Sequence, residues 1–232
     1  MRILMIAKWF PPDAGAENFV SGKTAIALQD AGVDCRVIAA RHDGPMDPSP
    51  VWREELSNVS RIPCRTGYWS RLANLGARIR LGHYGDLDWW AVEACAEGEG
   101  LLQEDEFDCI VSRSWPEQSM VVAERLSRRR GLPWIACIND PPLGYRPAPY
   151  DRGSPDLQTR LKVRWLRQVA PRIDHLIFPS RRLAEYWLDL VRCDEWDKVT
   201  IAPHIGWQAT GVADIQGEHE CNVVHLGNLH LH

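Results

Sequence analysis

The segment that follows the first apolar run, residues 3–7, combines rigid and polar residues. It has the sequence Pro-Pro-Asp-Ala-Gly-Ala-Glu and leads directly into a helix-like pattern. The two prolines fix φ and stiffen the turn, whereas Gly15 can adopt a positive φ and lets a ligand approach the backbone. Free N–H groups at the following helix start favour a phosphate or diphosphate. We therefore expect Gly15, Ala16 and Glu17 to contact a phosphate-bearing substrate; the alternative is an ordinary loop between a strand and a helix.

Two common nucleotide-binding motifs are not met in this segment. The dinucleotide motif G-x-G-x-x-G needs three glycines, and only Gly15 is present after the first run. The triplet Gly22-Lys23-Thr24 ends as a phosphate-binding P-loop does, but Glu17 stands where that motif requires its first glycine. The triplet also lies inside the helical pattern rather than in the loop.

A second polar pair, Asn139 and Asp140, follows the apolar run 134–138 and precedes two prolines. A carboxylate held at the end of a strand can orient a hydroxyl or an amine of a substrate, which makes Asp140 the candidate catalytic residue. Aspartate before proline is also a common turn starter, so Asp140 as a turn cap is the alternative. Asn139 shares both interpretations.

The elements that position these residues alternate regularly along the chain. Most of the strand-like runs are continuously apolar, as in strands that are covered on both faces. They are residues 3–7, 35–40, 59–63, 109–112, 134–138, 175–178, 199–202 and 222–226. Helical patterns lie between them, and this alternation implies right-handed βαβ units. We predict an α/β fold: a Rossmann-like, doubly wound parallel sheet with helices on both faces.

Three of the helical patterns have clear ends. The first is a stripe of Val20, Thr24, Ala27, Leu28 and Ala31, which Gly32 closes as a C′ residue. A second stripe, on residues 122–126, is ended by Gly131 and Pro133. A third contains Leu183, Trp187 and Leu190, with Ser180 as its N-cap.

Residues 44–106 interrupt the regular alternation of strands and helices. They begin with a proline-rich loop, and residues 68–81 and 87–102 predict two inserted helices. This insertion either has only a structural role or helps to bind the substrate, and the sequence favours neither.

Composition limits the class of protein. The chain has 232 residues and a formal net charge of −4, which argues against a general nucleic-acid binder. Its seven cysteines form an odd set without a C-x-x-C pair, and several lie in strand-like runs. They indicate buried free thiols rather than a disulfide framework or a zinc site. The first apolar run is too short for a signal-peptide core, and no run approaches 18 apolar residues, so we expect a cytoplasmic protein.

Four stretches, in order, resemble family-4 glycosyltransferases with the GT-B fold. "MRILMIAKWFPPDAGAENFV" resembles the family's first strand and its P-P-x-x-G-G loop, with Ala16 in place of the second glycine. "FDCIVSRSWPEQSMVVAERLSRRRGLPWIACINDPP" is similar to a strand, helix, strand and D-P-x stretch. "RIDHLIFPSRRLAEYW" and "DKVTIAPHIGW" resemble a later strand and the crossing between the two domains.

The resemblance implies an enzyme of two domains. Residues 1–205 would form the Rossmann-like, acceptor-side domain, and 206–232 an interdomain linker with the first strand of a truncated donor domain. The whole enzyme would transfer a sugar from a nucleotide-diphosphate sugar to an acceptor with retention, needing neither a metal nor a further cofactor. The fragment alone would be inactive. The alternative is a non-catalytic Rossmann-like binding or regulatory domain.

At several further positions this chain differs from the relatives that it resembles. Many relatives carry a histidine after the fourth strand, where this chain has Arg113, Ser114 and Trp115. The first two would bind acceptor phosphate or hydroxyls, and the tryptophan would stack on a sugar or pack. His204 lies where relatives often have Asn-Gly. Its side chain either faces the cleft between the two domains or forms hydrogen bonds with the backbone.

Ser180 and Arg181 begin a helix after the sixth strand, as an N-cap and a solvated arginine or as ligands of the substrate. Two basic stretches, residues 125–131 and 160–172, suggest peripheral attachment to anionic lipid at the inner membrane face, especially if the acceptor is lipid-linked. Solvated helix faces are the alternative for both stretches.

Overall fold

The computed structural model describes residues 1–41, 58–64, 70–83, 87–114, 116–142 and 156–204. Seven strands form one parallel sheet in the order β3-β2-β1-β4-β5-β6-β7. Their bounds are β1 Arg2–Ile6, β2 Asp34–Arg41, β3 Val59–Pro63, β4 Cys109–Ser114, β5 Trp134–Ile138, β6 His175–Phe178 and β7 Val199–Ile201. The predicted fold class is therefore confirmed, and seven predicted strands lie within two residues of the observed ones. The eighth predicted strand, 222–226, falls outside the described residues.

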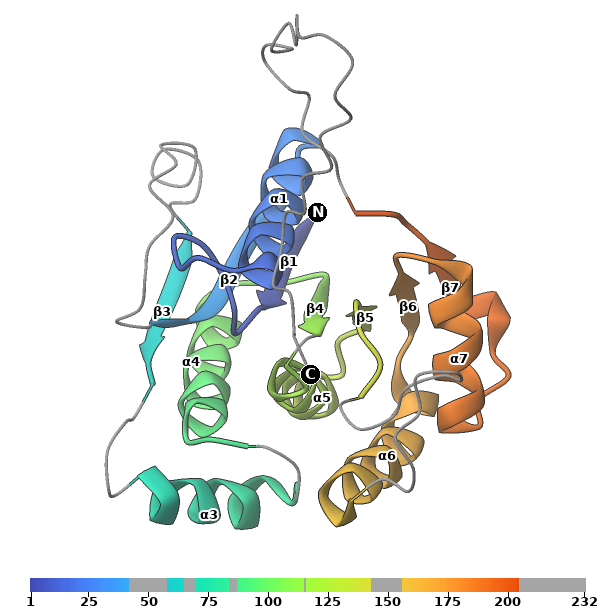
Figure 1. Cartoon of the computed structure of the whole chain (residues 1–232). Coiled ribbons are helices and arrows are strands. Elements are labelled where there is room, and N and C mark those ends of the chain that lie inside the picture. The colour runs from blue at the N-terminus through green and yellow to red at the C-terminus, as the bar shows by residue number, and fades with distance from the viewer. Residues whose placement is uncertain (42–57, 65–69, 84–86, 115, 143–155, 205–232) are drawn as a thin grey trace, which may run out of the picture.

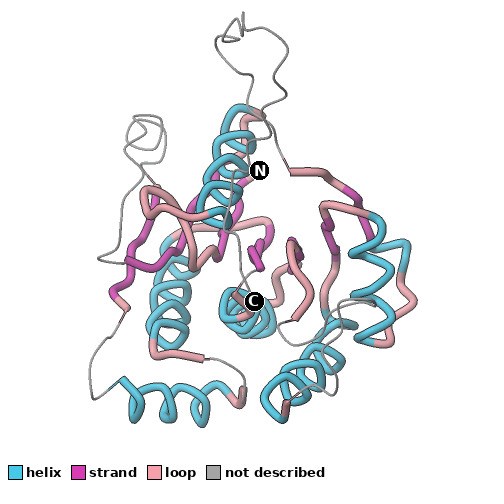
Figure 2. Tube along the Cα trace, viewed as in Figure 1, coloured by secondary structure: helices cyan, strands magenta, loops and turns pink. Residues whose placement is uncertain are grey.

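Helices cover both faces of this sheet (Figure 1). They are α1 Ala16–Asp30, α3 Ser70–Leu81, α4 Trp90–Glu104, α5 Gln118–Arg130, α6 Leu157–Val169 and α7 Arg181–Val191, with 3-10 turns at Ala170–Arg172 and Trp196–Lys198. Figure 2 shows how strands and helices alternate along the chain. The helices α4 to α7 share the larger apolar core with one face of the sheet, and α1 covers the other face.

The first helical stripe was assigned to the wrong face. In α1 the buried residues are Asn18, Ser21, Gly22 and Ala25, whereas Val20, Thr24 and Ala27 are only partly covered. Small residues face the sheet because they let the helix axis approach it closely. The predicted helix ends are confirmed: Gly32 and Gly131 have φ of 77° and 68°, and the Ser180 side chain accepts from Leu183 N.

The region predicted as an insertion contains two different helices. α4 is the crossover helix between β3 and β4, and its residues Trp90, Ala91 and Ala94 are almost fully buried in the larger core. α3 contacts α4 but buries only Ala77. The division at residue 205 remains a prediction, since the chain beyond residue 204 falls outside the described part.

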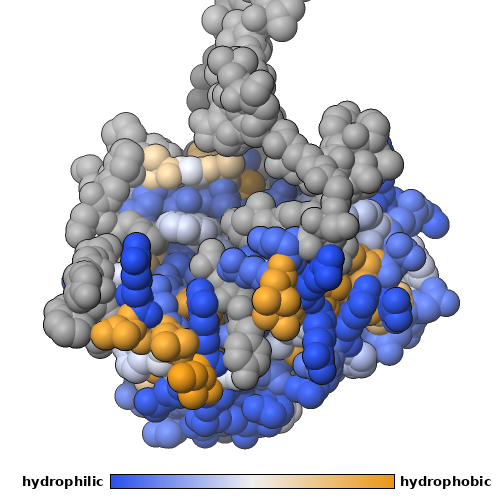
Figure 3. All heavy atoms as spheres, turned by 60° about the horizontal axis from the view of Figure 1, so that its bottom comes forward, coloured by the Kyte–Doolittle hydropathy of each residue, from blue (hydrophilic) through white to orange (hydrophobic). Residues whose placement is uncertain are grey.

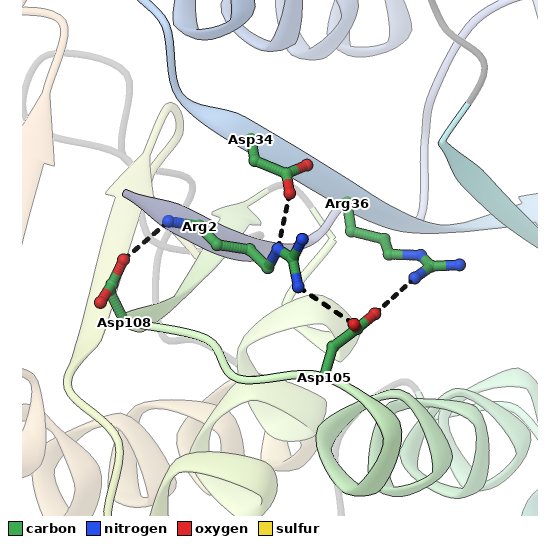
Figure 4. Close-up of polar contacts among 5 residues, drawn as sticks. All are labelled: Arg2, Asp34, Arg36, Asp105 and Asp108. Carbon is green, nitrogen blue, oxygen red and sulfur yellow. Dashed lines mark hydrogen bonds and ion pairs between the residues drawn. The ribbon is translucent and has the colours of Figure 1, made fainter.

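A charged network anchors the amino end of β1 (Figure 4). The Arg2 guanidinium lies 2.5 Å from Asp34 and 3.0 Å from Asp105, while the Arg2 backbone N–H donates to Asp108 at 2.7 Å. Arg36 reaches the second oxygen of Asp105 at 2.8 Å. These contacts connect β1, β2 and the turn before β4 at the edge opposite the candidate site. The network is largely exposed, so it orients the strand ends more than it stabilises the fold.

Candidate functional site

The strand order reverses between β1 and β4, and polar side chains gather beyond the carboxyl ends of these strands. In open α/β sheets, ligands bind at such a switch point. Glu17 lies in the first turn of α1, which follows β1, and Arg113 lies near the end of β4. Asn139 and Asp140 directly follow β5, and His204 follows β7. Residues that are far apart in sequence thus meet at one edge of the sheet.

Glu17 is held by an amide on a neighbouring loop. The Asn139 Nδ2 group donates to both carboxyl oxygens of Glu17, at 2.7 and 2.8 Å. The Asn139 backbone N–H donates to the carbonyl of Ser114 at 3.2 Å, which fixes the loop after β5 against the end of β4. The Glu17 carboxyl is therefore positioned by contacts from outside its own helix.

Arg113 is a buried cation with unused donors. Its side chain is only 6% exposed, and its Nη2 lies 3.6 Å from Glu17 Oε1, which is an ion-pair distance but too long for a hydrogen bond. Among the described residues, the Nε and Nη2 atoms of Arg113 have no hydrogen-bond partner. Buried donors without partners are rare in folded proteins. These two donors are thus unused but covered by the chain, and Glu17 supplies the ion-pair contact of the guanidinium.

The pKa values of the carboxyl groups at this edge are raised. Burial raises the pKa of Glu17 to about 7, although the charge of Arg113 and the hydrogen bond from Asn139 oppose this shift. Partial burial also raises the pKa of Asp140, which the nearby His204 lowers. The pKa of His204 is lowered by burial and by the charges of Arg113 and Lys23. Glu17 is thus protonated at mildly acidic pH, and the charge of Arg113 is then not compensated.

The loop between β1 and α1 is fixed on several sides. The Asn18 side chain donates to the carbonyl of Phe10 at 3.2 Å, and Arg61 on β3 donates to the carbonyl of Pro11. The peptide bond between Pro11 and Pro12 is cis. α1 begins at Ala16 without a side-chain cap on its N-terminus, and both Gly15 and Ala16 are exposed. The first amides of α1 are therefore presented at the same edge as Arg113.

Replacing Gly15 by alanine should lower the free energy of unfolding by about 1–3 kcal/mol. Gly15 has φ +156°, and a Cβ atom there would lie 2.7 Å from Asn18 Oδ1, so the side chain that holds Phe10 must shift. Gly15→Val should cost more than Gly15→Ala, because β-branched residues tolerate positive φ least. Urea unfolding of the chain measures both losses.

Gly100→Ala is the matched control for this prediction. A Cβ atom at Gly100, inside α4, meets nothing within 4 Å, so this variant should gain about 0.5–1 kcal/mol. Equal stabilities of the Gly15→Ala and Gly100→Ala variants would show that the backbone at Gly15 imposes no requirement for glycine.

The remaining candidates lie at different places. Ser114 is the buried last residue of β4, and its carbonyl holds Asn139, whereas Trp115 falls outside the described residues. Ser180 caps α7, and Arg181 pairs with Glu185 at 3.0 Å on an exposed surface and lies over the Trp196 ring. These contacts account for Ser180 and Arg181 without a ligand, although their role in binding remains untested.

The sequence analysis missed a buried charged group beside the site. Lys8, directly after β1, is 4% exposed, and its Nζ lies 2.6 Å from Asp88 Oδ2 and 2.8 Å from Gln118 Oε1. Lys162 on α6 is also buried and lies 3.5 Å from Glu117. The only signal in the sequence was a lysine at the end of a fully buried strand, because its partners are far away in the chain.

The described part of the chain shows no metal site, and its cysteines are structural. There, no three His, Cys, Asp or Glu side chains are grouped so that they could hold a metal ion. The six cysteines in this part are free, and burial raises the pKa of Cys35 and Cys95 to about 12, as expected for inert structural thiols. Of the helices that are described, none has the length and apolar character needed to cross a membrane.

Comparison with solved structures gives the fold of known glycosyltransferases. Anabaena Alr3699/HepE, solved in complex with UDP and glucose, is 12% identical with a TM-score of 0.52; the match covers 88% of this chain and 44% of HepE. Apo UGT2 of Phytolacca americana is 12% identical with a TM-score of 0.51, over 90% of this chain and 52% of UGT2. The chain thus spans about half the length of these two proteins. A search among curated protein sequences found no match.

The sequence itself also matches a family model. The model describes a glycosyl transferase 4-like domain and matches residues 15–203. This range runs from the start of α1 to beyond β7 and includes Glu17, Arg113, Asn139 and Asp140. The chain belongs to the glycosyl transferase 4-like family.

Proposed function

We propose that this chain is the acceptor-binding part of a glycosyltransferase that moves a sugar from a nucleotide-diphosphate donor to an acceptor, with retention of configuration. Membership of the family supports transferase chemistry. The complex of HepE with UDP and glucose supports a nucleotide-diphosphate sugar as the donor. In the transfer, the bond from the anomeric carbon to the diphosphate oxygen breaks, a bond to the acceptor oxygen forms, and the proton of the acceptor hydroxyl passes to the leaving diphosphate. The acceptor is a sugar or a lipid-linked molecule.

The buried guanidinium of Arg113 is the single observation that carries this proposal. Its Nε and Nη2 donors lack a hydrogen-bond partner and lie buried at the switch point of the sheet, at the same edge as the uncapped start of α1. A planar guanidinium and the amides of a helix start both bind phosphate oxygens well. Arg113, Gly15 and Ala16 therefore bind a phosphate group of a substrate in this proposal. Neutralising the leaving diphosphate with such donors needs neither a metal ion nor a further cofactor.

Asp140 and His204 have a different part in the proposal. Both are exposed at the same edge of the sheet, and each changes the pKa of the other. An exposed carboxylate at the end of β5 can accept a hydrogen bond from the acceptor hydroxyl and orient its oxygen toward the donor sugar. Glu17 holds Asn139, the neighbour of Asp140, and so acts as a positioning residue.

Asp140→Asn should lower kcat/KM for sugar transfer about 100-fold, the low end for a positioned acid–base group, because the amide no longer offers a carboxylate to the acceptor hydroxyl. Because the proposal assigns this chain only the acceptor side, parent and variant are compared with the donor domain present, using a panel of nucleotide sugars and following release of the nucleoside diphosphate. Because Asp140 is exposed, the melting temperature should remain unchanged. Glu185→Gln, an exposed carboxylate on α7 with 55% side-chain exposure, is the matched control and should retain full turnover.

Two outcomes would contradict parts of the proposal. Unchanged turnover of Asp140→Asn together with a lower melting temperature would leave Asp140 as a turn cap. Absence of turnover with every donor when the donor domain is present, while nucleotide sugars still bind, would favour the non-catalytic binding domain over the transferase.

A further inference from the structure

The apolar side of α3 faces the solvent, whereas an ordinary surface helix turns its apolar side toward the core. Leu72, Leu75 and Ile79 are 60%, 53% and 72% exposed, while Ala77 is its buried residue. At about 100° per residue, the three apolar side chains fall within an arc of about 60° that is centred opposite Ala77. Helices of soluble proteins normally direct such a stripe toward the core. The apolar stripe of α3 instead points away from the protein.

Arginines flank this stripe on both sides. Arg71 and Arg78 lie along one border of the arc and Arg80 along the other, and Arg71 and Arg80 are exposed. α3 contains no acidic residue, although the whole chain has 31 acidic residues and a net charge of −4. Positive charge is therefore concentrated beside the exposed apolar side chains.

α6 continues the same surface. The His83 ring, just after α3, packs edge-on against Trp165 of α6 with ring centroids 4.7 Å apart. α6 also contains no acidic residue; Leu157 is 72% exposed at its start, and Arg164 is exposed on the same outward side. Asp156, which precedes α6, accepts from Thr159 N at 2.7 Å as the helix cap. Figure 3 shows exposed apolar side chains between hydrophilic ones on this end of the molecule.

We propose that the surface formed by α3 and the outward side of α6 binds an anionic phospholipid membrane. Leu72, Leu75 and Ile79 would enter the interface, and Arg71, Arg80 and Arg164 would contact lipid phosphates. Amphipathic helices with basic borders bind membranes in this way. The inference rests on exposure and charge alone and holds whether or not the chain transfers sugar.

A second copy of the chain fits this surface less well than a membrane does. An isologous dimer would bury the arginines of both copies in one interface, and neither α3 nor α6 supplies a carboxylate to pair with them. An anionic membrane complements both the apolar stripe and its charged borders.

Sedimentation with vesicles tests the proposal. The chain should pellet with vesicles of equal parts phosphatidylcholine and phosphatidylglycerol, and not with pure phosphatidylcholine. The triple variant Leu72→Ser/Leu75→Ser/Ile79→Ser should lower the partition coefficient roughly tenfold or more. Arg71→Gln/Arg80→Gln should lower it about 30-fold, since each basic residue near the membrane contributes about a fivefold preference.

Arg181→Gln/Arg182→Gln is the matched control, because it removes two exposed arginines from α7 and should leave partitioning unchanged. All substituted residues are exposed, and circular dichroism melting confirms that each variant folds. Equal partitioning of the wild type and the triple variant would overturn the proposal. So would a wild-type dimer in gel filtration that the triple variant loses while neither protein binds vesicles, since the surface would then be a protein interface.

Discussion

Replacing Lys8 by alanine should lower the free energy of unfolding by about 3 kcal/mol, the low end of the range for breaking a buried ion pair. The ammonium group lies 2.6 Å from Asp88 and 2.8 Å from Gln118, and it also lies over the Trp90 ring at 5.7 Å. Gln118 is 5% exposed, so its carbonyl would lose a buried donor. The low end applies because the Asp88 side chain is 28% exposed and retains some water. Urea unfolding of wild type and variant measures the loss.

Two further variants separate charge from packing at Lys8. Lys8→Met keeps an unbranched stem of similar length, so any loss it shows comes from the missing ammonium group. Lys8→Met/Asp88→Asn should be more stable than Lys8→Met, because it no longer leaves a carboxylate without its partner. Arg181→Ala removes one partner of an exposed pair and should cost less than about 1 kcal/mol. A loss at Lys8 no larger than the loss at Arg181 would show that the buried pair does not stabilise the fold.

The strands were predictable from the sequence because this sheet is covered on both faces. Residues of β1 and β4 are almost all buried; β1 is a short apolar run after Arg2, and β4 begins with one at residues 109–111 before its buried polar end. The face of α1 was not predictable from the same rule. Its sheet-facing residues are a serine, a glycine and an alanine, which carry little hydrophobic signal although they allow the closest packing.

The positions of the site residues were predictable, but their pairing was not. Asp140, Arg113 and Glu17 could each be placed at the end of a strand or the start of a helix from local patterns. The contact between Glu17 and Asn139 joins residues that are 122 positions apart, and it depends on the register of β1, β4 and β5. No local pattern contains that information. Glu17 was therefore predicted only as part of a phosphate loop; the structure adds its contact with the loop after β5, while contact of Glu17 with a substrate stays a prediction.

The surface of α3 shows a second limit of pattern analysis. The spacing of Leu72, Leu75 and Ile79 is that of an amphipathic helix, and such spacing usually indicates a core-facing stripe. In the structure this stripe is exposed, because Ala77 and its neighbours on the other side contact α4. Periodicity identifies a helix and its faces, while the partner of each face comes from the tertiary structure.

Glu17→Gln should change how the stability of the protein depends on pH. The pKa of Glu17 is about 7 in the folded state and 4.5 in an unperturbed glutamate. Between these pH values the folded state binds one more proton than the unfolded state, so the stability of the wild type falls as the pH rises through this window. A shift of this size corresponds to about 3 kcal/mol, fully lost above pH 7. Glutamine resembles the protonated carboxyl group and does not titrate.

The difference between the two proteins isolates Glu17 from other titrating groups. Asp140 and His204 are present in both, so their contributions largely cancel when the unfolding free energies are subtracted at each pH. We expect the two proteins to be about equally stable at pH 4 and the glutamine variant to be more stable at pH 8. Glu185→Gln, which alters an exposed carboxylate, should follow the wild-type curve in parallel.

A Glu17→Gln curve parallel to the wild type from pH 5 to 8 would show that Glu17 is ionised throughout and forms an ordinary ion pair with Arg113. The guanidinium would then be neutralised by the chain itself, and its role as a phosphate ligand would lose its physical basis. If the predicted divergence is observed, protonation of Glu17 leaves the buried charge of Arg113 uncompensated below about pH 7. Binding of inorganic phosphate to the wild type should then weaken relative to the Glu17→Gln variant as the pH rises through 7, because an ionised Glu17 competes for the same cation, whereas the titration of phosphate itself is common to both.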